Sequence, residues 1–309
     1  MTETTKTVFE KHEIRKTKKQ KTAFIEYVKS VAEKQGYPCT VEMSRGGVRN
    51  IVIGSPEKAK VLYTAHYDTC PALPFPNFIT PKNFPLYLLY QLFVSIFFML
   101  VPAFALMYIS KRIFSALGIN PIFSFLLLEL TLLAILFLIL FGPANKHTAN
   151  DNTSGVTVLL NLMTEMPEEL RQKAAFIFFD YEETGLVGSS HFAKRHPQAH
   201  QKPLINFDCV SDGDHILFVV KKDAAPYLSL LKETFPENEI CKVEIQTKGV
   251  FYPSDQAKFQ QGIGVAALKK SKHRGILYMD RIHTKRDTVY REENIAFLAE
   301  GAIRFAERI

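Results

Sequence analysis

Residues 176–189 read FIFFDYEETGLVGS, an apolar run that ends in carboxylates and is followed by two glycines. The short, bounded apolar run predicts a buried strand over 174–179. Glu182 and Glu183 stand close behind that strand. Two adjacent carboxylates repel each other and lose hydration, so a nearby cation stabilises such a pair. The pair also suits a division of roles, in which one glutamate binds a metal and its neighbour acts as a general base.

Strand-like and helix-like segments alternate on both sides of this stretch. The pattern predicts helices over 18–36, 154–166, 225–235 and 294–308. It predicts the remaining strands over 48–54, 60–65, 204–207, 215–221, 243–246 and 265–268. Such alternation is typical of an α/β fold with a mixed, mostly parallel sheet.

Two long apolar runs interrupt this alternation. Residues 84–110 carry no charge, and residues 121–141 carry only Glu129. About 20 apolar residues suffice for a helix to cross the hydrocarbon core of a bilayer. The runs therefore predict a transmembrane hairpin over 84–141, with a hairpin buried in a soluble core as the alternative. We expect Pro102 to loosen the first helix, and Glu129 to face the partner helix, a polar atom or water.

The composition excludes several classes of protein. With 309 residues, 47% of them hydrophobic and 22% charged, the chain is not disordered, collagen-like or a disulfide scaffold. Its four cysteines lack paired spacing, which favours free thiols in a reducing compartment. The first 20 residues contain no apolar stretch, so we expect no cleavable signal peptide.

The formal net charge of +7 belongs mainly to the N-terminal segment. Residues 1–83 contain 14 Lys and Arg against 8 Asp and Glu. The excess is densest at four lysines, namely Lys16, Lys18, Lys19 and Lys21. This run is typical of a solvated helix face, and the alternative is a surface that rests on anionic lipid. No aromatic-plus-basic motif accompanies it, so we expect no nucleic acid partner.

Four further segments place possible ligands at predicted strand ends. In VLYTAHYDT (61–69), His66 and Asp68 share one face of a strand, although alone they suggest a surface pair. In HTANDNTSGV (147–156), Asp151 precedes a helix and alone suggests a turn or cap. LINFDCV (204–210) contains Asp208 as its only charge, and DRIHTKRDT (280–288) contains His283.

The complete set favours a metal centre over five unrelated surface groups. It offers three carboxylates and two imidazoles, from His66, Asp151, Glu183, Asp208 and His283. That mixture suits zinc or a similar divalent ion. Five ligands exceed a closed tetrahedral site, but they fit two open sites that share one bridging carboxylate.

In this order, the motifs resemble those of the co-catalytic zinc aminopeptidases of the bacterial leucyl aminopeptidase type. That wider family also includes glutaminyl cyclases, some carboxypeptidases, and receptor domains that have lost their metals. The shared motifs are HYD (66–68), DNTSG (151–155), EETGLVGS (182–189), Asp208 and HTKRD (283–287). SDQAKF (254–259) also resembles the family's SDxxxF segment near the substrate pocket. Lys285 and Arg286 stand where the family often has a proline.

The resemblance covers about 250 residues and implies a single three-layer α/β/α domain. This domain is discontinuous, over 1–83 and 142–309, with hairpin spans at about 84–110 and 121–141. The resemblance also implies two zinc ions and a cis peptide bond between Asp151 and Asn152.

The resemblance assigns a role to each residue of the set. Asp151 would bridge the two ions. His66 and Asp208 would complete one site, and Glu183 and His283 the other. Glu182 would be the general base, and Asp68 would orient His66.

We therefore expect a membrane-anchored zinc aminopeptidase that acts on peptides. Glutaminyl cyclase, carboxypeptidase and non-catalytic receptor or scaffold remain alternatives on the same fold. The two basic residues in the linker balance the two on the domain side, so the positive-inside rule gives no orientation. The missing signal peptide and unpaired cysteines favour a cytoplasmic catalytic domain at the cell membrane.

Overall fold

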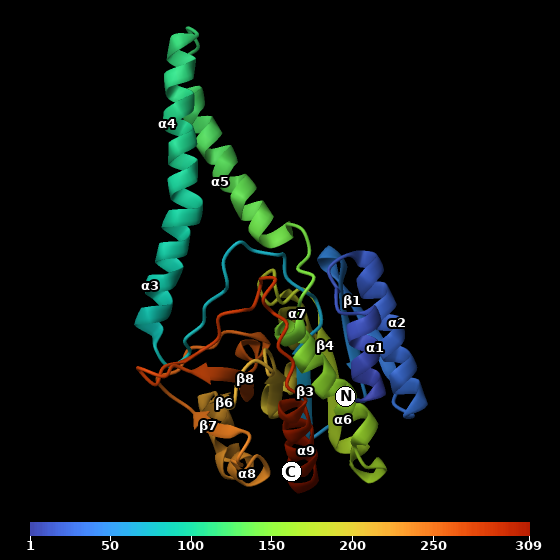
Figure 1. Cartoon of the computed structure of the whole chain (residues 1–309). Coiled ribbons are helices and arrows are strands. Elements are labelled where there is room, and N and C mark those ends of the chain that lie inside the picture. The colour runs from blue at the N-terminus through green and yellow to red at the C-terminus, as the bar shows by residue number, and fades with distance from the viewer.

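A computed structural model describes residues 1–309, and it confirms the α/β class (Figure 1). One nine-stranded mixed sheet lies between layers of helices. The strands are β1 Cys39–Ser44, β2 Val48–Ile53, β3 Val61–His66, β4 Ala174–Phe179, β5 Leu204–Phe207, β6 His215–Val220, β7 Lys242–Gln246, β8 Gly262–Lys270 and β9 Leu277–Tyr278. The helices around the sheet are α1 Glu3–Lys11, α2 Lys18–Lys34, α6 Gly155–Glu165, α7 Val187–Arg195, α8 Leu228–Thr234 and α9 Glu292–Arg308.

The centre of the sheet is parallel. Its strand order is β1-β2-β4-β3-β5-β8-β6-β7, with β9 paired to β8. Strands β4, β3, β5 and β8 run parallel, whereas β2 and β6 join them antiparallel on either side. The carboxyl ends of β3, β4 and β5 therefore meet at one edge of the sheet, which is where α/β folds place ligands.

The opening stretch forms β4, and both faces of this strand are buried. Phe176 and Phe178 belong to the large core beneath α2, α6 and α9, whereas Ile177 and Phe179 belong to a smaller core beneath α7. A strand with two buried faces needs apolar side chains at every position, because successive side chains point to opposite faces. This explains why the run is continuous and not alternating.

Most predicted elements are confirmed within a few residues. β4 and β5 have the expected bounds, while β8 starts three residues earlier than predicted, at two glycines that interrupt the apolar pattern. No pattern in the sequence predicted α1, α7, β1 or β9. β1 is an edge strand with mostly half-exposed side chains, so it lacks a clear apolar signal. All four cysteines are free, as expected.

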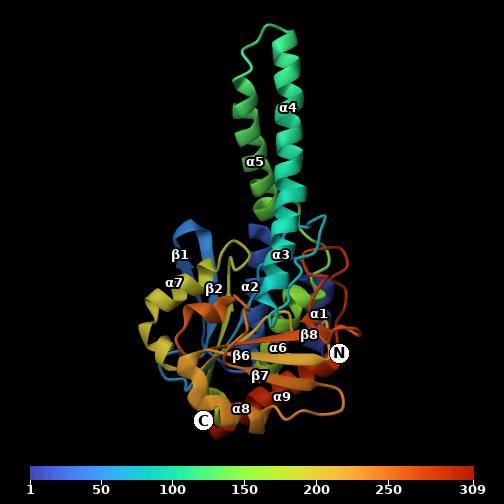
Figure 2. The same cartoon turned by 90° about the vertical axis from the view of Figure 1, so that its left-hand side faces the viewer.

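Two long helices project from the domain as a hairpin (Figures 1 and 2). The first is continuous over Phe84–Ala116 and comprises α3 Phe84–Val94, a π-helical segment Ser95–Leu100 and α4 Val101–Ala116. The second is α5 Phe123–Phe141. The π-helical segment ends two residues before Pro102, which confirms the expected loosening. α4 extends beyond the predicted span, so Lys111 and Arg112 lie on the helix and not in a linker.

Small side chains mediate the contact between the two helices. Ala103, Ser110 and Ser124 are buried there, as is typical of closely packed membrane helices. Most other hairpin side chains are exposed, so neither helix packs inside the domain. Of the three surroundings expected for Glu129, namely the partner helix, a polar atom or water, the structure shows neither of the first two, because Glu129 is exposed and makes no ion pair or hydrogen bond; contact with water stays a prediction. The small-residue contact uses a different face of α5.

The chain segments that lead into and out of the hairpin meet just after β3. Pro71 and Ala144 form an isolated antiparallel bridge, and the Ala72 amide donates to the Pro143 carbonyl at 2.8 Å. The first helix begins 13 residues after Pro71, at Phe84, and its start lies apart from the end of α5 (Figure 1).

The basic run is not one uniform solvated face. Lys18 and Lys19 are exposed, as that interpretation requires. Lys21 is buried, and its Nζ lies 2.5 Å from Asp180 Oδ1 and 3.7 Å from the centre of the Tyr181 ring. Lys16 is partly buried and donates to the Leu140 carbonyl at 3.4 Å, in the last turn of α5.

Candidate active site

The predicted ligands meet at the carboxyl edge of the parallel strands. His66 ends β3, Asp208 follows β5, and Glu183 lies in the turn after β4. Asp151 comes from the segment before α6, and His283 from the loop before α9. The structure thus brings together all five residues from five separate parts of the sequence.

The five side chains form two adjoining clusters that share Asp151. Asp151 Oδ1 lies 3.3 Å from His66 Nε2, which is also 3.5 Å from Asp208 Oδ1. The other oxygen, Asp151 Oδ2, lies 3.1 Å from His283 Nε2, which is also 3.3 Å from Glu183 Oε2. The ligand atoms within each cluster lie within 4.8 Å of one another. Asp151 thus presents one oxygen to each cluster.

The donor set fits divalent cations. Glu183 Oε1 and Asp208 Oδ1 are buried and make no hydrogen bond. A buried carboxylate oxygen without a partner is costly, and a cation would remove that cost. Nitrogen and carboxylate oxygen are ligands that zinc takes in proteins. Cys70 Sγ also lies in the second cluster, a contact that the sequence analysis did not predict.

The pKa values in the site report an excess of negative charge. Burial and the charge of Asp151 raise the pKa of Glu183 well above its usual value. Burial would lower the pKa of His66, but Glu182 and the hydrogen-bonded carboxylates around it raise that pKa well above normal. Burial and the charge of Glu183 raise the pKa of Cys70, which favours its neutral thiol. The site therefore stabilises added positive charge.

The Asp68 carboxylate connects the end of β3 to the glutamate turn that follows β4. Its Oδ1 accepts from the Glu182 amide at 3.0 Å, and its Oδ2 accepts from the Glu183 amide at 3.3 Å. The His66 ring lies beside it, with Nδ1 3.1 Å from the Asp68 carbonyl and 3.6 Å from Oδ1. Asp68 therefore fixes the turn that carries both glutamates, in addition to lying beside His66.

The segment around Asp151 is held by polar side chains from other loops. The Asp151–Asn152 peptide bond is cis, as expected. Asp287 accepts from the amides of Asn150 and Asp151, at 2.8 and 3.0 Å. A Cβ at Gly155 would lie 2.1 Å from the Phe207 carbonyl oxygen, so only glycine fits there. These contacts explain the DNTSG motif as a set of packing requirements around one carboxylate.

Close packing also explains the glycine at the start of α7. A Cβ at Gly188 would lie 2.2 Å from the Asp180 carbonyl oxygen and 2.6 Å from Asn50 Oδ1. The Gly188 amide donates to that Asp180 carbonyl at 2.9 Å. α7 therefore begins in direct backbone contact with the end of β4, which fixes the intervening glutamate turn.

Arg15 also supports the geometry of the site, and no pattern in the sequence indicates this role. It is fully buried, and its Nε donates to the Tyr67 carbonyl at 2.6 Å, between His66 and Asp68. Its Nη1 donates to Thr153 Oγ1 at 3.1 Å, two residues beyond Asp151. Burial lowers the pKa of Arg15 to about 10, so the side chain remains cationic at neutral pH. The N-terminal arm thus holds two ligand-bearing segments together.

A pocket of about 320 Å³ opens over the two clusters. Its walls include Ile79, Leu186, Tyr252 and Ile282. The Tyr252 hydroxyl donates to the Asp208 carbonyl at 3.0 Å, which connects the wall to a cluster residue. Tyr252 lies two residues before the SDQAKF segment, but no pattern in the sequence marked it. Within that segment Asp255 is buried, and burial raises its pKa to about 7.

Glu182 also lines this pocket, although it belongs to neither cluster. Burial raises the pKa of Glu182 well above its usual value. It therefore stands beside the clusters as a carboxyl group able to exchange a proton.

Known proteins resemble this chain in sequence and in fold. The sequence model of peptidase family M28 matches residues 138–302, which include the acidic and C-terminal motifs but not His66 or Asp68. No curated protein matches the chain.

Three solved structures illustrate the likeness in fold. The LapA aminopeptidase of Legionella pneumophila has a TM-score of 0.55 at 16% identity, over 98% of this chain and 69% of that one. The glutaminyl cyclase of Porphyromonas gingivalis has a TM-score of 0.55 at 15% identity, over 98% of each chain. A leucine aminopeptidase precursor of Bacteroides thetaiotaomicron has a TM-score of 0.56 at 14% identity, over 99% and 97%. The family match spans more than half of the chain, which therefore belongs to peptidase family M28 and is a hydrolase of the peptidase class.

Proposed function

We propose that the protein is a membrane-anchored aminopeptidase that uses two zinc ions. The observation that carries this proposal is the position of Asp151, whose two oxygens face separate clusters. In the proposed centre, His66 and Asp208 hold one ion with Asp151, and Glu183 and His283 hold the other. When bound, such a pair of ions polarises the scissile carbonyl and acidifies the attacking water.

Glu182 performs the proton transfers in this proposal. Its carboxylate accepts a proton from the attacking water and returns that proton to the leaving amine. Glu182 lines the pocket without joining either cluster, so it is available for this exchange. The Asp68 carboxylate holds the Glu182 backbone in place, because it accepts a hydrogen bond from the Glu182 amide. The partly apolar pocket walls receive the first side chain of the substrate and limit access of bulk water.

The test is Glu182→Gln in the purified full-length protein. Because Glu182 is outside both clusters, zinc content should remain near two ions per chain. Hydrolysis of aminoacyl chromogenic substrates should fall by roughly 10²–10⁴-fold. Glu169→Gln, at an exposed glutamate outside the pocket, is the matched control and should retain activity. Wild-type activity in Glu182→Gln would remove this glutamate from the proposed chemistry.

Glutaminyl cyclase activity is the second candidate, because solved cyclases share the fold. The resemblance associates cyclases with a single zinc ion, whereas the two clusters here favour two. Metal analysis, together with a panel of free and blocked N-termini and a glutaminyl peptide, separates the two activities. Cleavage that requires a free N-terminus excludes a carboxypeptidase, and any measurable turnover excludes a non-catalytic receptor.

We further propose that the hairpin spans a bilayer and that residues 1–83 and 142–309 form one catalytic domain. Both spans are long and apolar enough to cross a membrane, and they project away from the sheet (Figure 1). The pairing of the chain segments before and after the hairpin supports a domain that lies on one side of the membrane. The free cysteines favour the cytoplasmic side.

A further inference from the structure

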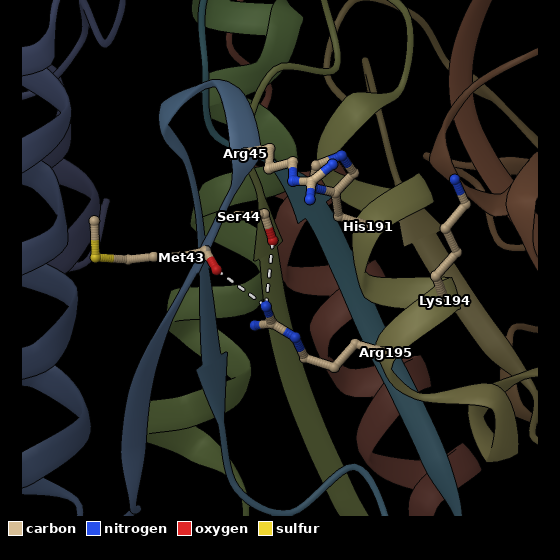
Figure 3. Close-up of a pocket in the computed structure, with 6 residues that line it drawn as sticks. All are labelled: Met43, Ser44, Arg45, His191, Lys194 and Arg195. Atoms are coloured by element: carbon tan, nitrogen blue, oxygen red, sulfur yellow. Dashed lines mark hydrogen bonds between the residues drawn. The ribbon is translucent and has the colours of Figure 1, made fainter.

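A cationic recess of about 640 Å³ lies between the β1–β2 turn and α7, outside the active site (Figure 3). Three basic side chains and His191 line it, and the basic ones are Arg45, Lys194 and Arg195. All three basic side chains are exposed. The recess therefore offers several cationic groups that converge from two elements distant in sequence.

Only one of these basic side chains is neutralised by the protein. Arg195 lies 3.3 Å from Glu42 and donates to the Met43 carbonyl at 3.0 Å. Arg45 and Lys194 have no carboxylate partner and make no side-chain hydrogen bond. Charged groups left unpaired in this way are available to an external anion.

Contacts connect this recess to the base of the hairpin. Lys16 donates to the Leu140 carbonyl in α5, and two residues later the Lys18 carbonyl accepts from Arg49. Arg49 lies just beyond the β1–β2 turn that carries Arg45. The turn lies at the end of the domain from which the hairpin projects (Figure 2). Lys18 and Lys19 on α2 are also exposed, so unpaired cations lie on both faces of the sheet at this end of the domain.

We propose that the cationic recess, together with Lys18 and Lys19, binds the phosphate headgroups of anionic phospholipids in the bilayer that holds the hairpin. The inference depends on the proposed membrane anchoring and adds a second, electrostatic contact. Basic residues near an anionic leaflet are attracted to its negative surface potential, which decays within a Debye length. Arg45 and Lys194 contact headgroups at the recess, while Lys18 and Lys19 do so nearer α5.

An exposed apolar side chain on the same strand supports a lipid surface. The Met43 side chain is 69% exposed and points away from the recess, to the opposite face of β1, while its carbonyl accepts from Arg195 at the recess (Figure 3). Next to headgroups, an exposed apolar side chain enters the interface with the acyl chains. Gly46 and Gly47 occupy the turn with positive φ and no side chain, so they allow the backbone to approach the surface closely.

The chain contains no tryptophan, which makes a single introduced tryptophan a specific probe. Met43→Trp in the full-length protein would be reconstituted into nanodiscs of zwitterionic lipid, with or without a third of anionic phosphatidylglycerol. Brominated acyl chains quench tryptophan at short range. We expect clearly stronger quenching and a blue-shifted emission in the anionic discs, with both effects suppressed by high salt.

Charge reversal identifies the groups responsible. Arg45→Glu with Lys194→Glu, in the Met43→Trp background, should reduce the anionic-lipid-dependent quenching by about tenfold or more. The matched control reverses Lys222 and Lys232, near or on α8 at the far end of the domain, and should leave quenching unchanged. Ile240→Trp is the corresponding control probe, because this exposed side chain follows α8.

Three outcomes are distinguishable. Failure of the hairpin to insert, seen as loss of the protein from the nanodisc fraction, would refute the membrane anchoring itself. Insertion with equal quenching in both lipids, or quenching unaffected by charge reversal, would refute headgroup binding alone. A spectral response to inorganic phosphate in zwitterionic discs, equal to that given by anionic lipid, would assign the recess to a soluble anion and overturn the inference.

Discussion

Arg15→Met tests how the N-terminal arm supports the proposed metal centre. The substitution keeps a long apolar stem but removes the guanidinium, whose Nη1 also donates to the His12 and Glu13 carbonyls at 2.7 and 3.0 Å. It leaves those two carbonyls and that of Tyr67 without their donor. It also removes a positive charge that interacts with the buried carboxylates of Asp68 and Asp151.

The magnitude follows from those lost contacts. Each buried acceptor left unpaired costs about 1–3 kcal/mol, and partial access of water reduces the total. We therefore expect the free energy of unfolding to fall by roughly 3–5 kcal/mol. Because Arg15 orders the backbone beside His66 and Asp151, zinc affinity should also fall by about 10–100-fold.

The assay is denaturant unfolding of the detergent-solubilised protein, with and without zinc, together with chelator competition for zinc affinity. Arg15→Lys keeps the charge, but a single ammonium lacks the guanidinium fork, so it should recover only part of both losses. Lys19→Met, at an exposed lysine nearby, is the control and should behave as wild type. Arg15→Met with stability within about 0.5 kcal/mol of wild type and unchanged zinc affinity would refute the reasoning.

Three further predictions address separate parts of the molecule. Lys21→Met leaves Asp180 buried without its partner and should lower the free energy of unfolding by roughly 3–5 kcal/mol, whereas adding Asp180→Asn should recover part of it in the same assay. Gly188→Ala should displace the glutamate turn and reduce activity more than it reduces soluble yield; full activity would show that β4 and α7 adapt. In a Cys39→Ser chain, which lacks the one half-buried cysteine, a thiol label at Ser115→Cys should react only from the side opposite the catalytic domain, because Ser115 is exposed in the last turn of α4 while the other three cysteines are buried; labelling from the inside would reverse the proposed orientation.

The parts of the fold predicted from sequence are those whose physical requirements act locally. The run in β4 is apolar at every position because both of its faces are buried. The carboxylates and histidines stand out because they follow such strands, and parallel strands bring their carboxyl ends together. The hairpin is equally visible, since each span is apolar along its whole length.

The parts that were missed depend on contacts between distant segments. Arg15 looks like one more basic residue in a basic arm, and only the tertiary structure shows its contact with Tyr67. Lys21 was grouped with exposed lysines because nothing near it in sequence indicates Asp180. Tyr252 contacts Asp208 from a loop without periodicity. Glu129 is exposed because small residues elsewhere determine which face of α5 packs, and its expected contact with water stays a prediction.

The way the hairpin is inserted determines how closely it is connected to the active site. Its first helix begins 18 residues after His66, behind a loop in which the Leu73 amide donates to the His283 carbonyl at 2.8 Å and the Asn77 amide donates to the Ile282 carbonyl at 3.4 Å. On the returning side, the Asn145 amide donates to the Cys70 carbonyl at 3.1 Å, and Asn145 Nδ2 donates to the Thr284 carbonyl at 3.0 Å. The chain segments on both sides of the hairpin are therefore hydrogen-bonded to loops that carry cluster residues. A displacement of the hairpin would act on those segments, so the site is connected to the hairpin through the loops that carry His283 and Cys70.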